Sequence, residues 1–185
     1  MNPPAVIVLA SGRGERFIAS GGTGSKLQAL LAGKPVLQRT LDAVRASGLP
    51  WHLEDAGHAG MGDSIAAGVS ATRDAGGWLI LPGDLPLVRP ESLRRVAAAL
   101  AGQGVVLPTH EGRQGHPVGF GPDCRAALLM LTGPQGAAQV ARAQKLANRA
   151  LELELDDPGI VTDIDTVHDL ARAESLLSGS AGTPH

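Results

Sequence analysis

The sequence predicts an α/β fold in which helices cover both faces of an open, mostly parallel sheet. Three uninterrupted apolar runs, at residues 6–9, 78–81 and 105–108, are typical of strands buried on both faces. Segments with apolar residues at helical spacing lie between these runs, and this alternation indicates parallel strands joined by helical crossovers. We expect one domain over residues 1–178 and a disordered tail at 179–185, since 185 residues suffice for one sizeable core.

The first half of the chain contains two predicted helices. Pro35 suits the first turn of a helix and Gly48 suits its end, so a helix is expected between them. Asp63 or Ser64 is expected to cap a second helix that runs to about residue 73. Between these helices, residues 50–54 predict only a weak strand, because several of them are polar.

The second half continues the alternation. Residues 109–115 are polar and turn-like, and residues 150–155 alternate apolar and charged side chains, as a half-exposed strand near a sheet edge does. The other expected elements are helices over residues 90–102, 123–131, 135–145 and 166–177 and a strand over residues 118–120. Ligands of such sheets bind outside the carboxyl ends of the strands, so we expect the loops at 11–26, 83–86 and 109–116 on one rim.

Composition and charge narrow the possible partners. The net charge is −2 and the sequence pI is about 6.3, so no broad basic surface is expected to attract nucleic acid or an anionic membrane. Aromatic residues make up only 2% of the chain, which leaves little for stacking on bases. Without a basic leader or a long apolar segment, we expect a soluble, cytoplasmic protein. The single cysteine, Cys124, is expected to be a structural thiol.

The loop after the first strand has the composition of a phosphate-binding loop. It carries five glycines, at positions 12, 14, 21, 22 and 24, together with Arg13, Arg16 and Lys26. Glycine lets backbone N–H groups approach an anion closely, and the cations balance its charge. The alternative is a flexible surface loop between ordinary elements.

Two groups of carboxylates are candidate metal ligands. Asp84 directly follows the second apolar run, where it would face the glycine-rich loop, and Mg²⁺ prefers hard oxygen ligands. An aspartate that bonds its own turn is the alternative, because Gly83 and Pro86 flank it. For the segment at 163–169 we favour a capping box made by Thr166 and Asp169, with a second metal carboxylate from Asp163 or Asp165 as the alternative.

The histidines provide few chemical signals. His116 lies in the turn between Gly115 and Pro117, where it donates either to a phosphate or within the turn itself. The other histidines have no metal-ligand spacing and are expected to lie on the surface; they are His52, His58, His110, His168 and His185.

Six short motifs follow one another along the chain. They are Leu-Ala-Ser-Gly at 9–12 with Arg16 and Lys26, Gly-Lys-Pro-Val-Leu at 33–37, Gly-Met-Gly-Asp-Ser-Ile-Ala-Ala-Gly at 60–68, Gly-Asp-Leu-Pro-Leu-Val at 83–88, Gly-His-Pro-Val at 115–118 and Asp-Ile-Asp-Thr at 163–166. In this order they resemble the motifs of the MobA-like NTP transferases, and they extend over most of the chain. The motifs at 60–68, 83–88 and 115–118 are most similar to those of molybdenum cofactor cytidylyltransferases.

The resemblance implies a Rossmann-like nucleotidyltransferase fold and a specific reaction. The reaction moves CMP from CTP to the terminal phosphate of molybdopterin and releases pyrophosphate, with Mg²⁺ as cofactor and a molybdoenzyme as a further partner. Catalytic roles are implied for Arg16, Lys26 and Asp84. Nucleotide contacts are implied for Leu9, Ala10, Ser11, Gly12, Arg13, Gly14, Gly62 and Ser64. Acceptor contacts are implied for Gly115, His116 and Pro117, and metal coordination for Asp84 and Asp165.

The chain departs from the family pattern in three places. The loop between Arg16 and Lys26 is longer than usual, and the segment between Gly48 and Gly60 is shorter. Ser11 matches neither the alanine of the cytidylyl pattern nor the glycine of the guanylyl pattern, so the base stays open. Two alternatives remain: a nucleotidyltransferase that uses another NTP and a sugar-phosphate or phospho-acid acceptor, and a non-catalytic nucleotide-binding protein of molybdoenzyme maturation.

Overall fold

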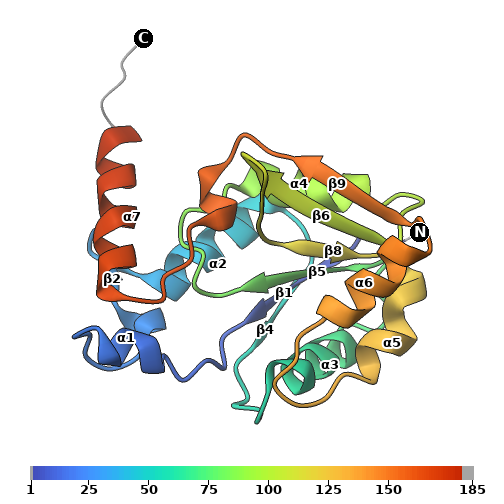
Figure 1. Cartoon of the computed structure of the whole chain (residues 1–185), viewed down its shortest axis with the longest axis horizontal. Helices are drawn as coiled ribbons and strands as arrows, with labels where there is room; N and C mark the ends of the chain where they lie inside the picture. The colour runs from blue at the N-terminus through green and yellow to red at the C-terminus, as the bar shows by residue number, and fades with distance from the viewer. Residues whose placement is uncertain (1, 181–185) are drawn as a thin grey trace.

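A computed structural model describes residues 2–180 and confirms the predicted α/β fold class (Figure 1). Seven strands form the main sheet in the order β4-β1-β5-β8-β6-β7, and β9 pairs with β6. The strands are β1 (Ala5–Leu9), β4 (Trp51–Glu54), β5 (Trp78–Pro82), β6 (Val105–His110), β7 (Arg113–Gln114), β8 (Val118–Phe120) and β9 (Ala150–Glu154). β1 runs parallel to β4 and β5, and β6 runs parallel to β9, whereas β8 is antiparallel to both neighbours.

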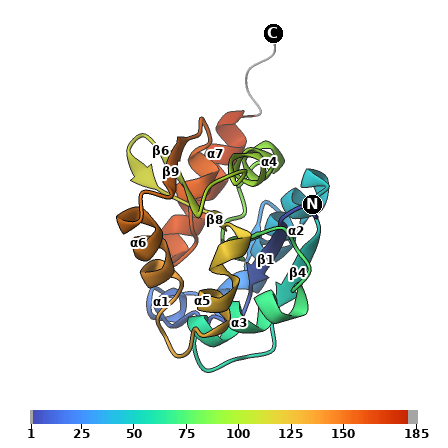
Figure 2. The same ribbon diagram turned by 90° about the vertical axis from the view of Figure 1, so that its right-hand side faces the viewer.

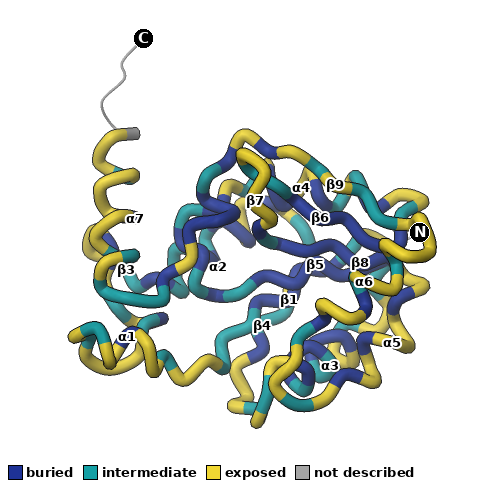
Figure 3. Tube along the Cα trace, in the orientation of Figure 1, coloured by how far each residue is buried: buried dark blue, intermediate teal, exposed yellow. Residues whose placement is uncertain are grey.

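Helices cover both faces of this sheet, as Figure 2 shows. α2 (Val36–Ser47) and α4 (Pro90–Ala99) lie on one face, and α3 (Met61–Ala71), α5 (Arg125–Leu129) and α6 (Ala138–Leu146) lie on the other. Within β1, Val6 and Val8 pack into the core beneath α2 and α4, while Ile7 packs into the core beneath α3. Because both faces are covered, the strand is an uninterrupted apolar run, and Figure 3 shows the central strands buried.

A third, smaller core lies beyond the carboxyl ends of β1 and β5. It joins Phe17, Leu27, Leu31, Ile164 and Ala173. The elements around it are α1 (Glu15–Ala19), the 3₁₀ turn η1 (Lys26–Gln28), the β2–β3 hairpin (Leu30–Leu31, Lys34–Pro35) and α7 (Val167–Ser180). Figure 1 shows α7 beside α1 and β2. This small core anchors both ends of the glycine-rich loop.

Several element boundaries differ from the predicted ones. α3 begins at Met61 with Gly60 as its N-cap, so neither Asp63 nor Ser64 caps it. The Asp63 carboxylate accepts from the Gly133 amide at 3.0 Å instead. The expected loop at 109–115 is a hairpin, because β6 continues to residue 110 and pairs with β7. The predicted helix at 123–131 is shorter and follows the 3₁₀ turn η2 (Pro122–Cys124).

The terminal predictions have mixed outcomes. The predicted tail at 179–185 begins inside α7, which extends to residue 180, and residues 181–185 lie outside the described part of the chain. No helix within residues 2–180 combines the length and the apolar character that crossing a membrane requires. Cys124 is a buried free thiol that donates to the carbonyl of Gly104 at 3.2 Å, in keeping with a structural role.

One buried carboxylate connects the segment after β9 to the start of α4. Asp157, next to the 3₁₀ turn η3 (Pro158–Val161), accepts from the Arg89 amide at 3.0 Å, the Ser92 hydroxyl at 2.6 Å and the Gly159 amide at 2.9 Å. It therefore caps both η3 and the start of α4, although the two are distant in sequence.

Replacing Asp157 with alanine should destabilise the fold by about 3 kcal/mol, since the substitution leaves buried donors unpaired. Urea unfolding followed by circular dichroism would measure the change in the free energy of unfolding. The neighbouring exposed Asp156→Ala is the matched control and should cost less than about 0.5 kcal/mol. Equal unfolding midpoints for the two variants would contradict the assigned capping role.

Candidate active site

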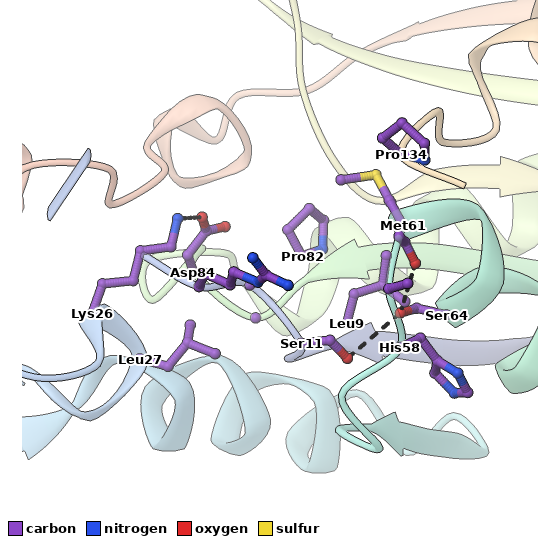
Figure 4. Close-up of a pocket in the computed structure, with 15 residues that line it drawn as sticks. Leu9, Ser11, Lys26, Leu27, His58, Met61, Ser64, Pro82, Asp84 and Pro134 are labelled. Carbon is purple, nitrogen blue, oxygen red and sulfur yellow. Dashed lines mark hydrogen bonds and ion pairs between the residues drawn. The ribbon is translucent and has the colours of Figure 1, made fainter. Parts of the chain in front are cut away.

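A cavity of about 350 Å³ opens at the carboxyl ends of β1 and β5 (Figure 4). This is the edge where ligands bind in open α/β sheets. The glycine-rich loop, the start of α3, the turn after β5 and Pro134 form its walls. Seven of the residues predicted to contact substrate or metal line it: Leu9, Ser11, Gly12, Arg13, Lys26, Ser64 and Asp84.

Lys26 joins the two carboxylates at one end of the cavity. Its Nζ lies 2.7 Å from Oδ2 of Asp84 and 2.9 Å from Oδ1 of Asp165. The side chains of Lys26 and Asp84 are only 13% and 14% exposed, so this pair is shielded from water. Arg16 adds a second cation 2.9 Å from Asp165, but its side chain is 80% exposed. The longer glycine loop therefore still brings Lys26 to the rim.

Burial and charge shift the pKa values of this cluster. Burial raises the pKa of Asp84, and the charge of Lys26 only partly offsets that effect. For Lys26, burial opposes the charged form, yet the two carboxylates hold its pKa above the ordinary value. The Lys26 ammonium is therefore charged near neutral pH, and Arg13 also lines this cavity.

Three carboxylates form a candidate metal site. Oxygens of Asp84, Asp163 and Asp165 all lie within 4.8 Å of one another. Oδ1 of Asp84 is buried and has no hydrogen-bond partner among the described residues, so this oxygen is available to coordinate a metal ion. Three hard oxygen donors with an unsatisfied buried atom fit a cation such as Mg²⁺.

The capping box predicted at the start of α7 is also present. Asp169 accepts from the amide and the hydroxyl of Thr166, both at 2.8 Å, and its own amide donates to the Thr166 hydroxyl. Thr166 and Asp169 make the cap, and the carboxylate of Asp165 contacts Lys26 and Arg16 beside Asp84 instead. The two interpretations of this segment are therefore compatible.

Serine hydroxyls lie at the opposite end of the cavity, as Figure 4 shows. Oγ of Ser64 is 3.5 Å from Oγ of Ser11 and donates to the carbonyl of Gly60 at 3.2 Å. Oγ of Ser11 donates to the carbonyl of Glu54 at 3.4 Å. The hydroxyls of Ser11 and Ser64 make this end polar, whereas the opposite end carries the ion pair of Lys26 and Asp84.

The glycines of the Gly-Met-Gly motif serve a packing contact. A Cβ on Gly62 would lie 2.8 Å from the carbonyl oxygens of Thr132 and Gln135, so only glycine lets α3 approach that loop. The Gly62 amide donates to the carbonyl of Gly133 at 2.9 Å. Gly62 does not line the cavity, and its predicted contact with the nucleotide stays a prediction.

A second cavity of about 280 Å³ adjoins the first, with which it shares Leu9, Met61 and Pro82. Its walls are mostly apolar, and Gln114 and His116 are the polar side chains that line it. Burial lowers the pKa of His116, so the imidazole is neutral, and its Nδ1 has no hydrogen-bond partner within residues 2–180. Gly115 and Pro117 are buried and do not line this cavity.

The remaining predicted residues lie around the first cavity. Gly14 and Arg16 line an adjoining hollow of about 320 Å³ with Lys26 and Asp165. Ala10 lies behind the wall, where its amide donates to the carbonyl of Glu54. Sequence reasoning missed Met61, Pro82 and Pro134 as lining residues, and it placed His58 on the surface. Proximity of His58 to the Gly-Met-Gly motif was the available signal.

Comparison with known proteins shows a matching family model and a full-length relative. Residues 42–150 match the MobA-like NTP transferase domain, a span that includes Ser64, Asp84 and His116. The chain is 32% identical to 2-C-methyl-D-erythritol 4-phosphate cytidylyltransferase of Cereibacter sphaeroides, over 96% of this chain and 98% of that protein. It covers only 24% of the bifunctional protein GlmU of Desulfitobacterium hafniense and 50% of phosphoenolpyruvate guanylyltransferase of Nocardia farcinica.

Solved structures share the fold at low sequence identity. A nucleotidyl transferase from Methanothermobacter thermautotroptrophicus superposes with a TM-score of 0.82 at 21% identity, over 97% of this chain and all of that one. Molybdopterin-guanine dinucleotide biosynthesis protein A from Archaeoglobus fulgidus superposes with a TM-score of 0.61 at 20% identity, over 95% and 99% of the two chains. Family match, full-length relative and fold agree, and the chain belongs to the MobA-like NTP transferase family.

Proposed function

We propose that the protein is a nucleotidyltransferase that moves CMP from CTP to a phosphate-bearing acceptor of the molybdopterin type. The observation that carries this proposal is the buried contact of Lys26 with Asp84 and Asp165, in a cavity whose wall is the glycine-rich loop. One cation and a cluster of carboxylates at the edge of an α/β sheet suit a nucleoside triphosphate and its metal.

In the proposed reaction an oxygen of the acceptor phosphate attacks the α-phosphorus of the nucleotide. A new P–O bond forms, the bond to the β-phosphate breaks, and pyrophosphate leaves with that electron pair. The protein acts by positioning the two phosphates and neutralising charge. Lys26 and Arg13 are the cations that line the cavity, and Arg16 lies next to Asp165. No general base is required, because the acceptor phosphate is already ionised.

Asp84, Asp163 and Asp165 are the residues that would hold Mg²⁺. When bound, the ion would neutralise charge on the triphosphate. In the structure, the ammonium of Lys26 balances the negative charge of two of these carboxylates. The proposal therefore gives Lys26 two sets of anionic partners, the carboxylates of the protein and the phosphates of the substrate.

Support for CTP comes from the full-length relative, whose name is that of a cytidylyltransferase, and from the family motifs at 60–68 and 115–118. Ser11 and Ser64 supply hydroxyls at the end of the cavity away from Lys26, where the base and ribose would lie. A hydroxyl both donates and accepts, so these serines tolerate several bases.

The second cavity supports an acceptor with a flat, mostly uncharged ring system. Its apolar walls, among them Ile80, Val118 and Phe120, offer few partners for the many hydroxyls of a sugar. The neutral His116, with its unpartnered Nδ1, suits a hydrogen bond to a ring N–H or amide. Molybdopterin, the acceptor that the family motifs imply, carries a ring system and a terminal phosphate, and it is the acceptor that we propose.

Pyrophosphate release tests the proposal directly. Each NTP is assayed with Mg²⁺ and, in turn, molybdopterin, N-acetylglucosamine 1-phosphate, 2-C-methyl-D-erythritol 4-phosphate and phosphoenolpyruvate. We expect turnover with CTP and molybdopterin, and a loss of at least about 100-fold in Asp84→Asn. Asp74→Asn, exposed at the opposite end of the sheet, is the control and should keep full activity. Tight CTP binding without turnover on any acceptor would instead favour the non-catalytic alternative.

Narrowing the second cavity should weaken the binding of the acceptor and leave the binding of the nucleotide unchanged. Ala141 of α6 lines that cavity, so Ala141→Leu should raise the KM for the acceptor by about tenfold and leave the KM for CTP unchanged. Ala143→Leu, exposed on the same helix, is the matched control and should change neither value. Equal acceptor KM values in the two variants would count against the second cavity as the acceptor site.

Removing the Lys26 charge should strengthen metal binding in the nucleotide-free protein. Lys26→Met frees two carboxylates from a competing cation, so the affinity for Mn²⁺ should rise by about tenfold or more. Paramagnetic resonance of free Mn²⁺ measures that affinity without any turnover. Arg16→Met removes an exposed charge that contacts Asp165 alone and should have a much smaller effect. An unchanged affinity in Lys26→Met would argue against these carboxylates as the metal ligands.

A further inference from the structure

A buried glutamate holds two histidines beside the cavity. Oε1 of Glu54 lies 3.1 Å from Nε2 of His58, and Oε2 lies 3.2 Å from Nε2 of His52. The Glu54 side chain is only 7% exposed, and the amide of Ala56 donates to Oε1 at 3.3 Å. This cluster takes no part in the phosphate chemistry proposed above.

Hydrogen bonds keep the Glu54 carboxylate ionised. Burial opposes the charged form of Glu54, yet the bonds from His52 and Ala56 and the nearby His58 hold its pKa below the ordinary value. An ionised carboxylate only accepts hydrogen bonds, so His58 must donate to it from Nε2. In the neutral imidazole this leaves Nδ1 of His58 as an acceptor.

The position of His58 relates it to the nucleotide rather than to the acceptor. His58 lines the first cavity together with Ala59, Gly60 and Ser64, and it is absent from the lining of the second. Figure 4 shows His58 beside Ser64, at the end away from Lys26 and Asp84. A nucleotide whose triphosphate lies against Lys26 would place its base toward this end.

We propose that His58 selects the base of the nucleotide, with Glu54 as the residue that positions its ring. A fixed acceptor at this place favours a base with an exocyclic amino group, such as cytosine, over one with a carbonyl there, such as uracil. The hydroxyls of Ser11 and Ser64 can donate to or accept from either base, so we assign the discrimination between cytosine and uracil to His58. This inference rests on the proposed function, since it assigns a base-reading residue to the same nucleotide site.

The experiment is the binding of CTP and of UTP, each with Mg²⁺, measured by calorimetry on the full chain. Wild-type protein should bind CTP at least about tenfold more tightly than UTP, the amount expected when a buried acceptor loses its donor. His58→Ala should bring the ratio of the two dissociation constants close to one, mainly through weaker CTP binding. His58→Gln should restore part of the preference, because the amide oxygen is again an acceptor.

The matched control is His52→Ala. His52 bonds the same carboxylate but does not line the cavity, so its loss should leave the CTP to UTP ratio above about fivefold. Glu54→Gln tests positioning and should lower the ratio while both nucleotides still bind. Nucleotide binding with the same ratio in wild type and His58→Ala would overturn the inference and leave the proposed function standing. Wild-type protein that binds no NTP would overturn both.

Discussion

The contact of one lysine with two aspartates organises the functional edge of the protein. Asp84 and Asp165 lie 58 and 139 residues away from Lys26 in the chain, yet an oxygen of each lies within 3 Å of Nζ of Lys26. A carboxylate as buried as Asp84 requires a cation or hydrogen-bond donors, because desolvation penalises its charged form. The ion pairs of Lys26 with Asp84 and Asp165 hold three segments together: the end of the glycine-rich loop, the turn after β5 and the segment before α7. The cavity therefore depends on charge as much as on packing.

Much of the fold could be predicted because its strands are buried on both faces. Within β1, neighbouring side chains enter different cores, so the strand has to be apolar without interruption. The ends of helices and strands were harder to predict where contacts with a distant segment determine them. The first turn of α3 starts at least three residues earlier than predicted, with Gly60 rather than Asp63 as the N-cap, since the loop at 132–136 packs on Gly60 and Gly62 and supplies the Gly133 carbonyl. A capping rule considers only residues close in sequence, so it could not include a contact with residue 133.

The site could be predicted as far as its motifs extend. Motifs identified Lys26, Asp84 and Ser64, which line one cavity, because their residue types carry the chemistry of phosphates and metals. Asp163 or Asp165 was the alternative second metal carboxylate, and the structure brings oxygens of both close to Asp84, a three-carboxylate cluster that no local pattern specifies. Apolar lining residues such as Met61 and Pro82 were missed, since their composition is that of any core. The sequence also could not distinguish the two reasons for a glycine at position 62. Close packing against the loop at 132–136 requires glycine there, and a close contact with a ligand would require it as well.

The short segment after Gly48 has a physical consequence for the nucleotide site. Only residues 55–60 connect the end of β4 to the start of α3, and within residues 2–180 no strand pairs with the outer edge of β4. Glu54 thus ends an edge strand directly behind Ser11, and donors for its buried carboxylate have to come from nearby: His52, Ala56 and His58. A chain with further elements here could satisfy such a carboxylate elsewhere. In this protein the short connection places the buried carboxylate of Glu54 against His58 in the wall of the cavity, so this edge of the sheet shapes the cavity end that is proposed to bind the base.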